Sequence, residues 1–214
     1  MSRVAGIFLF LFLISSGVAF SADKASIIFL EGDVTLNGAP ASVGDAVTAG
    51  DTLQTAADAL CEIVFNARNI VHMTAGTALK FDPSQLSRGA TLQKGAIAMV
   101  LRNLAVLQGS QVRFSVTTST AVAGVRGTCF FVKVEDANNT FICCCNGAIH
   151  LEGGAGEFSQ NLTSPHHEEV RITRSPTGLS VGAAPMLYHT DGDVEAIAAR
   201  IGESVDWTRV DRQP

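Results

Sequence analysis

The sequence is poor in two features that nucleic-acid and carbohydrate partners usually require, aromatic platforms and positive charge. It contains one tryptophan and one tyrosine, beside 12 phenylalanines. Its 15 lysines and arginines face 20 aspartates and glutamates, so the formal net charge at pH 7 is −5. Because contact with a phosphate backbone requires basic patches, this balance argues against nucleic acid as a partner.

Motifs of familiar catalytic chemistry are also missing. We find no phosphate-binding glycine loop, no paired carboxylates, and no serine, histidine and aspartate in an order typical of hydrolases. The cysteines form no Cys-X-X-Cys pair, and no base stands at an obvious position to activate one as a nucleophile. We therefore expect a protein that is not an enzyme.

Long hydrophobic runs are confined to the N-terminus. Residues 4–14 are apolar, Arg3 precedes them and small residues follow. This order is typical of a secretory signal peptide cleaved after Ser21, and the run is shorter than the roughly 20 residues of a membrane-spanning helix. We expect residues 1–21 to be removed and the protein to be periplasmic or extracellular, without a membrane span. A signal kept as an anchor is the alternative.

Short alternating apolar runs fill most of the remaining chain. Between residues 26 and 155 they are separated by glycine or polar turns at spacings of roughly ten residues, a pattern typical of all-β domains. Asn37-Gly38 is one tight-turn signal. We place a β domain at residues 22–155. The rest, residues 156–214, is expected to form a loop, an edge strand and an amphipathic helix.

The C-terminal helix is predicted from its first turn. Thr190 followed by Asp193 fits a capping box, and apolar residues recur at helical spacing from Val194 onward. We therefore expect a helix over residues 191–204 that docks on the sheet. Residues 152–180, rich in glycine, serine, proline and charge, are expected to form a covering loop with one edge strand.

Three stretches resemble the FecR domain. They are VGDAVTAGDTLQTAADALCEIVF, with its Gly-Asp turns, FSVTTSTAVAGVRGTCFFVKV, and CNGAIHLEG, and the resemblance spans residues 29–153. It implies an exported β-rich domain of sandwich or short β-helical form. The best-known FecR proteins are membrane-spanning regulators that relay a signal to a sigma factor.

This sequence shows neither a cytoplasmic N-terminal domain nor an internal membrane helix, so we do not expect such a relay. What the resemblance implies is a binding or interaction module of the bacterial cell envelope, with an envelope protein or glycan as partner. Arg126, inside the AVAGVRGT phrase, either staples a turn, pairing with Glu135 or Asp136, or contacts an anion or partner.

Five cysteines, an odd number, raise the question of thiol chemistry. Residues 127–135 and 140–149 are expected to form an antiparallel hairpin in which Phe130 lies opposite Cys144 and Cys129 opposite Cys145. Since side chains alternate along a strand, Cys144 then faces the core, whereas Cys143, Cys145 and Cys129 share the outer face.

Three interpretations of these thiols stay open. Cys129 and one neighbour form a disulfide, as export permits, or the thiols have a redox or nucleophilic role. Alternatively, the outer thiols bind a metal or haem with histidines that the segment 152–189 brings back over that face. Zinc, copper and iron all suit thiolate and imidazole ligands. The candidate ligands are Cys143, Cys145, Cys129, His166, His167 and His189.

Overall fold

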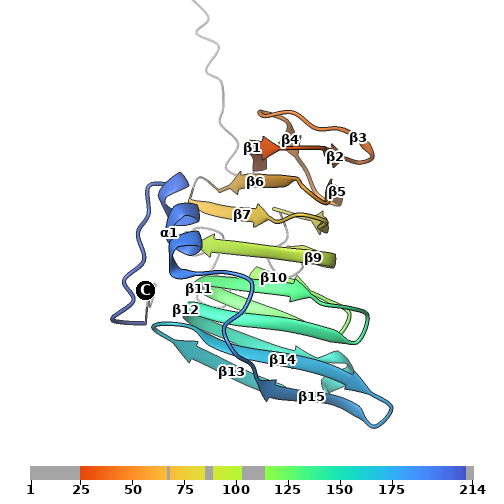
Figure 1. Cartoon of the computed structure of the whole chain (residues 1–214), viewed down its shortest axis with the longest axis vertical. Helices are drawn as coiled ribbons and strands as arrows, with labels where there is room; N and C mark the ends of the chain where they lie inside the picture. The colour runs from red at the N-terminus through yellow and green to blue at the C-terminus, as the bar shows by residue number, and fades with distance from the viewer. Residues whose placement is uncertain (1–24, 67, 85–88, 103–113, 211–214) are drawn as a thin grey trace, which may run out of the picture.

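The computed structural model describes residues 25–66, 68–84, 89–102 and 114–210, without the side chains of Arg126, Thr128 and Ala155. The described residues are mainly β-strands, with one α-helix near the C-terminus, so the expected fold class is confirmed (Figure 1). The predicted signal peptide lies outside the described residues.

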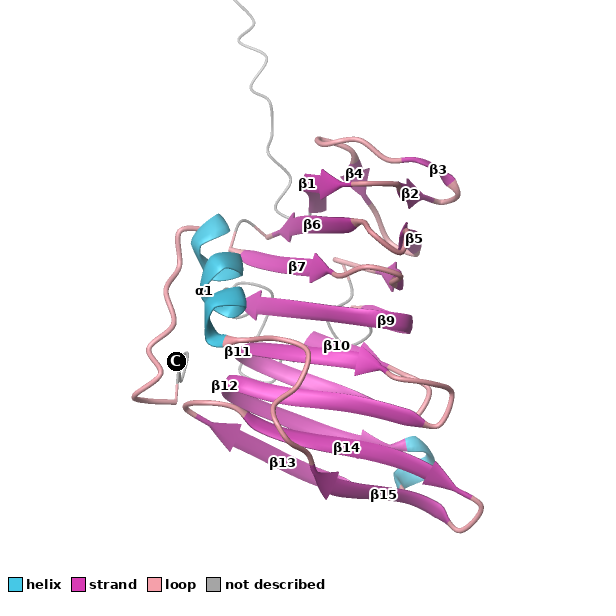
Figure 2. Ribbon diagram, in the orientation of Figure 1, coloured by secondary structure: helices cyan, strands magenta, loops and turns pink. Residues whose placement is uncertain are grey.

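Strands make up most of the described elements, and Figure 2 shows how little of the ribbon is helical. The α-helix is α1 (Asp191–Arg200), and a short 3₁₀ helix, η3, spans Gly154–Gly156. The strands are β1 (Ala25–Glu31), β2 (Val34–Leu36), β3 (Ala39–Pro40), β4 (Ala46–Val47), β5 (Asp51–Thr55), β6 (Leu60–Phe65), β7 (Asn69–Met73), β8 (Ala78–Phe81), β9 (Ala90–Leu101), β10 (Phe114–Thr117), β11 (Ala121–Val134), β12 (Asn139–Gly153), β13 (Ser159–Ser164), β14 (Glu168–Ser175) and β15 (Gly178–Ala183).

The main path of the sheet runs β15-β14-β12-β11-β10-β9-β7-β6-β1-β4. Its pairings are antiparallel except for β9 with β10. Asn37 and Gly38 join β2 to β3 with φ angles of 54° and 82°, as a tight hairpin turn requires. None of the described helices is long and apolar enough to cross a bilayer.

The main hydrophobic core lies on one face of the sheet. Phe65, Phe81 and Phe114 form its aromatic centre, with ring centroids 5.2 Å apart for Phe65 and Phe81 and 5.4 Å apart for Phe65 and Phe114. All three side chains are fully buried. Cys61 is also fully buried in this core.

A second, smaller core lies on the opposite face, under α1. The helix contributes Val194, Ile197 and Ala198, and strands β7, β9, β11 and β12 contribute the residues beneath it, including Phe131 and Phe141. In Figure 1 the helix lies across β7 and β9. The outer face of the cysteine hairpin is therefore covered, so its thiols are buried rather than exposed at the surface.

The cysteine hairpin is formed by β11 and β12. They pair antiparallel and Phe130 lies opposite Cys144, as expected. Cys129, however, lies opposite Asn146, so the prediction that it faces Cys145 is wrong. The pairing register shifts on both sides of Cys129, close to Gly127, which has a φ of 54°. An irregularity of this kind displaces one strand against its partner, and this displacement brings Asn146 opposite Cys129.

The C-terminal region contains more strand than we expected. Residues 152–180 were predicted to be a loop with one edge strand, yet β13, β14 and part of β15 lie there. The 15-residue β12 extends far enough to pair with both β13 and β14, so tertiary pairing outweighs a weak local pattern. Helix α1 has the predicted capping box but ends at Arg200 instead of residue 204.

Candidate metal centre

The three adjacent cysteines divide between the two cores. Cys144 belongs to the main core, whereas Cys143 and Cys145 belong to the second core beneath α1. This separation follows from the alternation of side chains along β12. All three cysteines have an exposed fraction of 0%.

Two histidines complete a compact group with Cys143 and Cys145. The sulfur atoms are 3.5 Å apart, Cys143 Sγ lies 3.2 Å from His167 Nδ1, and Cys145 Sγ lies 3.3 Å from His189 Nε2. The four potential ligand atoms all lie within 4.8 Å of one another. The structure thus brings together thiols and imidazoles that are up to 46 residues apart in the sequence.

His167 reaches the thiols from the turn between β13 and β14. Its φ of 47° is in the left-handed region, and its backbone N–H donates to the carbonyl oxygen of Cys145 over 2.9 Å. This bond ties the turn directly to β12. The side chain of His167 is 6% exposed.

His189 reaches them from the segment that precedes α1. Its ring stacks on Phe131 with centroids 4.6 Å apart and an angle of 11° between the planes. Thr190, the next residue, caps the helix, and Tyr188, the preceding one, has a φ of 70°. A left-handed conformation is costly for a non-glycine residue, so packing and capping together hold this imidazole in place.

Each imidazole has an acceptor at the nitrogen that points away from the sulfurs. His167 Nε2 lies 2.8 Å from Oδ1 of Asp191, and His189 Nδ1 lies 3.0 Å from the carbonyl oxygen of Leu187. A neutral imidazole that donates through one nitrogen has a lone pair on the other. Both free lone pairs would then face a cysteine sulfur.

The sulfur pair is electrostatically asymmetric. The hydrogen bond from Cys145, aided by the His167 and His189 rings when their facing nitrogens carry a proton, lowers the pKa of Cys143 to about 4 against the opposing effect of burial. Burial, aided by Cys143, raises the pKa of Cys145 well above its ordinary value. The arrangement therefore favours a thiolate at Cys143, and the thiolate is the form of cysteine that binds metals.

The other two candidate ligands lie outside this group. The thiol of Cys129 faces Arg102 Nη2 at 3.8 Å, and burial raises its pKa to about 11. His166 has a half-exposed side chain that lies 3.0 Å from Oδ2 of Asp191. All five cysteines are free thiols, so the structure contains no Cys129 disulfide.

Glu135, one of the acids considered as a partner of Arg126, is paired with Arg171. Glu135 accepts hydrogen bonds from Nε and Nη2 of Arg171 over 2.7 and 2.8 Å. The side chain of Arg126 is outside the described part of the structure. The roles considered for Arg126 therefore stay predictions.

Sequence reasoning missed two residues around the imidazoles. Asp191 was given no role at this site from the sequence, although it accepts a hydrogen bond from His167. Trp207 stacks on His167 with centroids 5.1 Å apart and an interplanar angle of 24°. The available signal for Asp191 was its position two residues after a candidate ligand, whereas Trp207 carried none.

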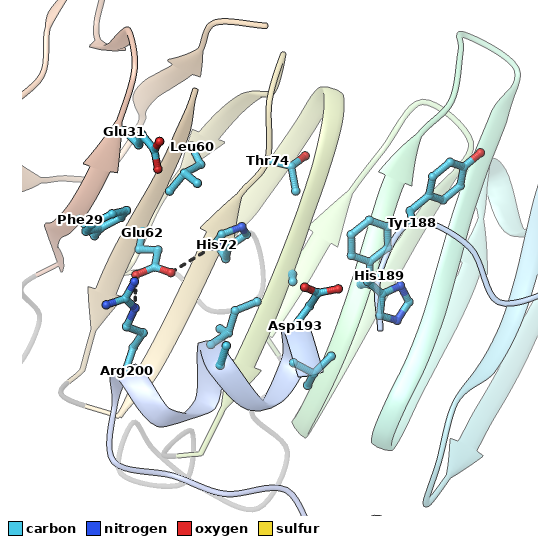
Figure 3. A pocket seen from close by; sticks show the side chains of 15 residues that line it. Phe29, Glu31, Leu60, Glu62, His72, Thr74, Tyr188, His189, Asp193 and Arg200 are labelled. Atoms are coloured by element: carbon cyan, nitrogen blue, oxygen red, sulfur yellow. Dashed lines mark hydrogen bonds and ion pairs between the residues drawn. The ribbon is translucent and has the colours of Figure 1, made fainter. Parts of the chain in front are cut away.

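A groove of about 400 Å³ adjoins the second core, between α1 and the strands beneath it (Figure 3). Glu62, only 3% exposed, lies there between His72 Nδ1 and Arg200 Nε, each 3.1 Å from one of its oxygens. His189 also lines the groove. His72 is half-buried and paired with Glu62.

Comparison with known proteins gives one match to a family model. Residues 51–150 match the family model described as FecR protein. The matched segment includes Cys143 and Cys145 and ends before His167 and His189. No curated protein matches the chain.

Two crystal structures of a "putative anti-sigma factor" from Parabacteroides distasonis ATCC 8503 are similar to the protein. The one at 1.65 Å has a TM-score of 0.50 and 14% identity, over 70% of this chain and 74% of that chain. The one at 2.50 Å has a TM-score of 0.49 and 14% identity, over 62% and 59%. The chain thus spans less than two thirds of the second structure, and the similarity concerns the fold alone.

Proposed function

The chain carries a FecR domain, and from this premise we propose that it is an exported, non-catalytic interaction module of the bacterial cell envelope. The observation that carries the proposal is the family match over residues 51–150, which favours a regulatory module that acts by binding protein partners. The N-terminal segment, with Arg3 followed by the apolar residues 4–14, supports export.

A contact surface for such a partner is offered by the segment just before His189. Met186, Leu187 and Tyr188 are 42%, 36% and 50% exposed, and they are adjacent in the chain. Large apolar side chains that cluster at a surface often mark interaction sites. Lys133 Nζ lies 4.9 Å from the centre of the Tyr188 ring, and the Tyr188 hydroxyl donates to Glu135. This surface, residues 186–188, is therefore both apolar and held in place.

Export is tested by cell fractionation of the full chain and of a variant without residues 2–21. We expect the full chain to appear outside the cytoplasm in a shortened form, whose new N-terminus is Ala22. The deletion variant should stay in the cytoplasm. Full-length protein confined to the cytoplasm would refute the export proposal.

Partner binding is tested by a photo-crosslinking amino acid at Leu187 in cells that export the protein. Val43, 61% exposed and located between β3 and β4, is the matched control position. We expect one discrete adduct with an envelope protein from position 187 and none from position 43. No adduct at either position, or the same adducts from both, would contradict the proposed surface.

A further inference from the structure

The group formed by Cys143, Cys145, His167 and His189 has the composition and the dimensions of a metal site. We propose that these four side chains bind one zinc ion in tetrahedral coordination. The proposal concerns the described residues themselves and does not depend on export or on a partner protein.

The spacing of the ligand atoms supports a single tetrahedral ion. Zinc binds cysteine sulfur at about 2.3 Å and histidine nitrogen at about 2.0–2.1 Å, so the edges of the tetrahedron measure about 3.3–3.8 Å. The sulfur–sulfur separation is 3.5 Å, and the sulfur–nitrogen separations are 3.2 Å for Cys143 and His167 and 3.3 Å for Cys145 and His189. Small shifts of the side chains would therefore suffice to place an ion between them.

The hydrogen bonds behind the imidazoles support the same ion. Asp191 accepts from His167, and the carbonyl of Leu187 accepts from His189. Metal-binding histidines usually donate their second ring N–H to a carboxylate or a carbonyl, which fixes the tautomer and the ring orientation. Both imidazoles thus have the environment that a ligand requires.

Burial and ligand number indicate a structural site. The two cysteines are 0% exposed and His189 is 8% exposed, and four protein ligands leave no open coordination position for a substrate. The 4.8 Å limit on the ligand atoms accommodates one ion but not a porphyrin or a two-iron cluster. Zinc suits a closed site with two thiolates and two imidazoles.

Binding has a defined proton balance. Two Zn–S and two Zn–N bonds form as the Zn–O bonds to the water ligands of the aqueous ion break, and the protons that the Cys143 and Cys145 thiols carry pass to the solvent. No electron is transferred, because zinc stays divalent. Affinity should therefore fall in acid, where protons compete for the same sulfur and nitrogen atoms.

The ion would join three separate parts of the chain. Cys143 and Cys145 lie on β12, His167 on the β13–β14 turn, and His189 at the entrance to α1. The side-chain amide of Asn146 reinforces this connection, since it donates to the carbonyl oxygens of Pro165 and Asp206 over 2.8 and 3.0 Å. We infer that the zinc fastens α1 over the second core.

The decisive measurement is the metal content of the protein purified without a histidine tag. Cys143→Ser and His189→Ala each remove one proposed ligand. Cys144→Ala and His150→Ala are matched controls, because Cys144 belongs to the main core and His150 bonds Asn161 and Glu152 instead. We expect one zinc per chain in the wild type and in both controls, and zinc at background level in the two ligand variants.

A second measurement keeps the test valid if a ligand variant fails to fold. Wild-type protein is stripped of metal under reducing conditions and titrated with Co²⁺ alone. We expect one equivalent to produce intense visible bands of tetrahedral cobalt and a thiolate-to-cobalt charge-transfer band, both abolished by one equivalent of Zn²⁺. Weak octahedral bands would overturn the proposal.

Three other outcomes would also overturn it. One is metal-free wild type in which peptide mapping finds a disulfide between Cys143 and Cys145, whose sulfurs are close enough to compete with a metal. Another is undiminished zinc in the Cys143→Ser and His189→Ala variants. Stoichiometric copper or iron instead of zinc would overturn the choice of metal.

Discussion

Asp191 Oδ1 accepts a hydrogen bond from His167 Nε2 over 2.8 Å, while Nδ1 of the same imidazole faces the Cys143 sulfur. The carboxylate lies on the first turn of α1. This imidazole therefore links the start of the helix to β12. This link places Asp191 among the residues that should set metal affinity without touching the metal.

Replacing Asp191 by asparagine should weaken zinc binding by roughly 10–100-fold. The amide keeps the size of the side chain but loses the charge that orients and polarises His167. Competition with a chelator of known affinity measures the change. Asp58→Asn, at an exposed turn, is the control. Equal affinities in the wild type and the Asp191 variant would rule out this positioning role.

The single tryptophan should report metal binding. Trp207 stacks on His167 and donates from Nε1 to Glu195 on α1 over 2.8 Å. Since the indole contacts a proposed ligand, zinc should shift its fluorescence emission, and Co²⁺ should quench it. Titration of metal-free protein measures both effects. A Trp207→Phe variant should bind zinc yet give neither signal, and a wild-type spectrum unchanged by metal would contradict the packing.

Much of this site could be predicted from sequence periodicity and capping motifs, and each wrong prediction has an identifiable physical cause. The period of two along β12 placed Cys143 and Cys145 on one face, and the capping box at Thr190 located the start of α1. The prediction that Cys129 lies opposite Cys145 was wrong because the irregularity near Gly127 shifts the register of the two strands. Backbone irregularities of this kind depend on the partner strand, which the local sequence does not encode.

The sequence suggested that histidines approach the outer thiols, but it could not tell which histidines do so. Neighbouring His166 and His167 look equivalent in the sequence, and only the left-handed turn at His167 decides which ring enters the second core. The strands after residue 156 were missed because β13 and β15 are mostly exposed. A strand of that kind has too few buried side chains to give a clear alternation.

Gly95 should be intolerant of a side chain. Its φ is 79°, and a Cβ added there would lie 2.4 Å from Thr77 Oγ1 and 2.5 Å from Thr77 Cα. Thr77 is buried and exchanges hydrogen bonds with Ala96, so it has no room to move. We expect Gly95→Ala to lower the free energy of unfolding by about 2–4 kcal/mol.

Gly76→Ala is the matched control for this steric contribution. Gly76 has a similar φ of 65°, but no atom lies within 4 Å of the added Cβ. This control should show only the cost of the left-handed backbone, about 1 kcal/mol. Urea unfolding of both variants measures the difference. Equal losses would mean that the contact with Thr77 relaxes without cost.

The Glu135–Arg171 pair should contribute stability that acid removes. The hydrogen bond from Arg171, aided by the one from Tyr188, lowers the pKa of Glu135 below its ordinary 4.5, against burial and the neighbouring Asp136. A depressed carboxyl pKa stabilises the folded state above the unfolded value. The contribution should therefore be complete above about pH 4.5 and decline as the pH falls through the folded pKa.

Arg171→Met tests this pair, because it removes the charge and keeps much of the apolar stem. At neutral pH the variant should be less stable by about 1 kcal/mol or less, since the arginine is partly exposed. The wild type and the variant share every other acid-sensitive group, including the proposed zinc ligands. Their difference in urea unfolding free energy should therefore shrink on acidification below pH 4.5. A difference that stays constant down to pH 3 would mean that Glu135 keeps an ordinary pKa and that the arginine acts only through packing.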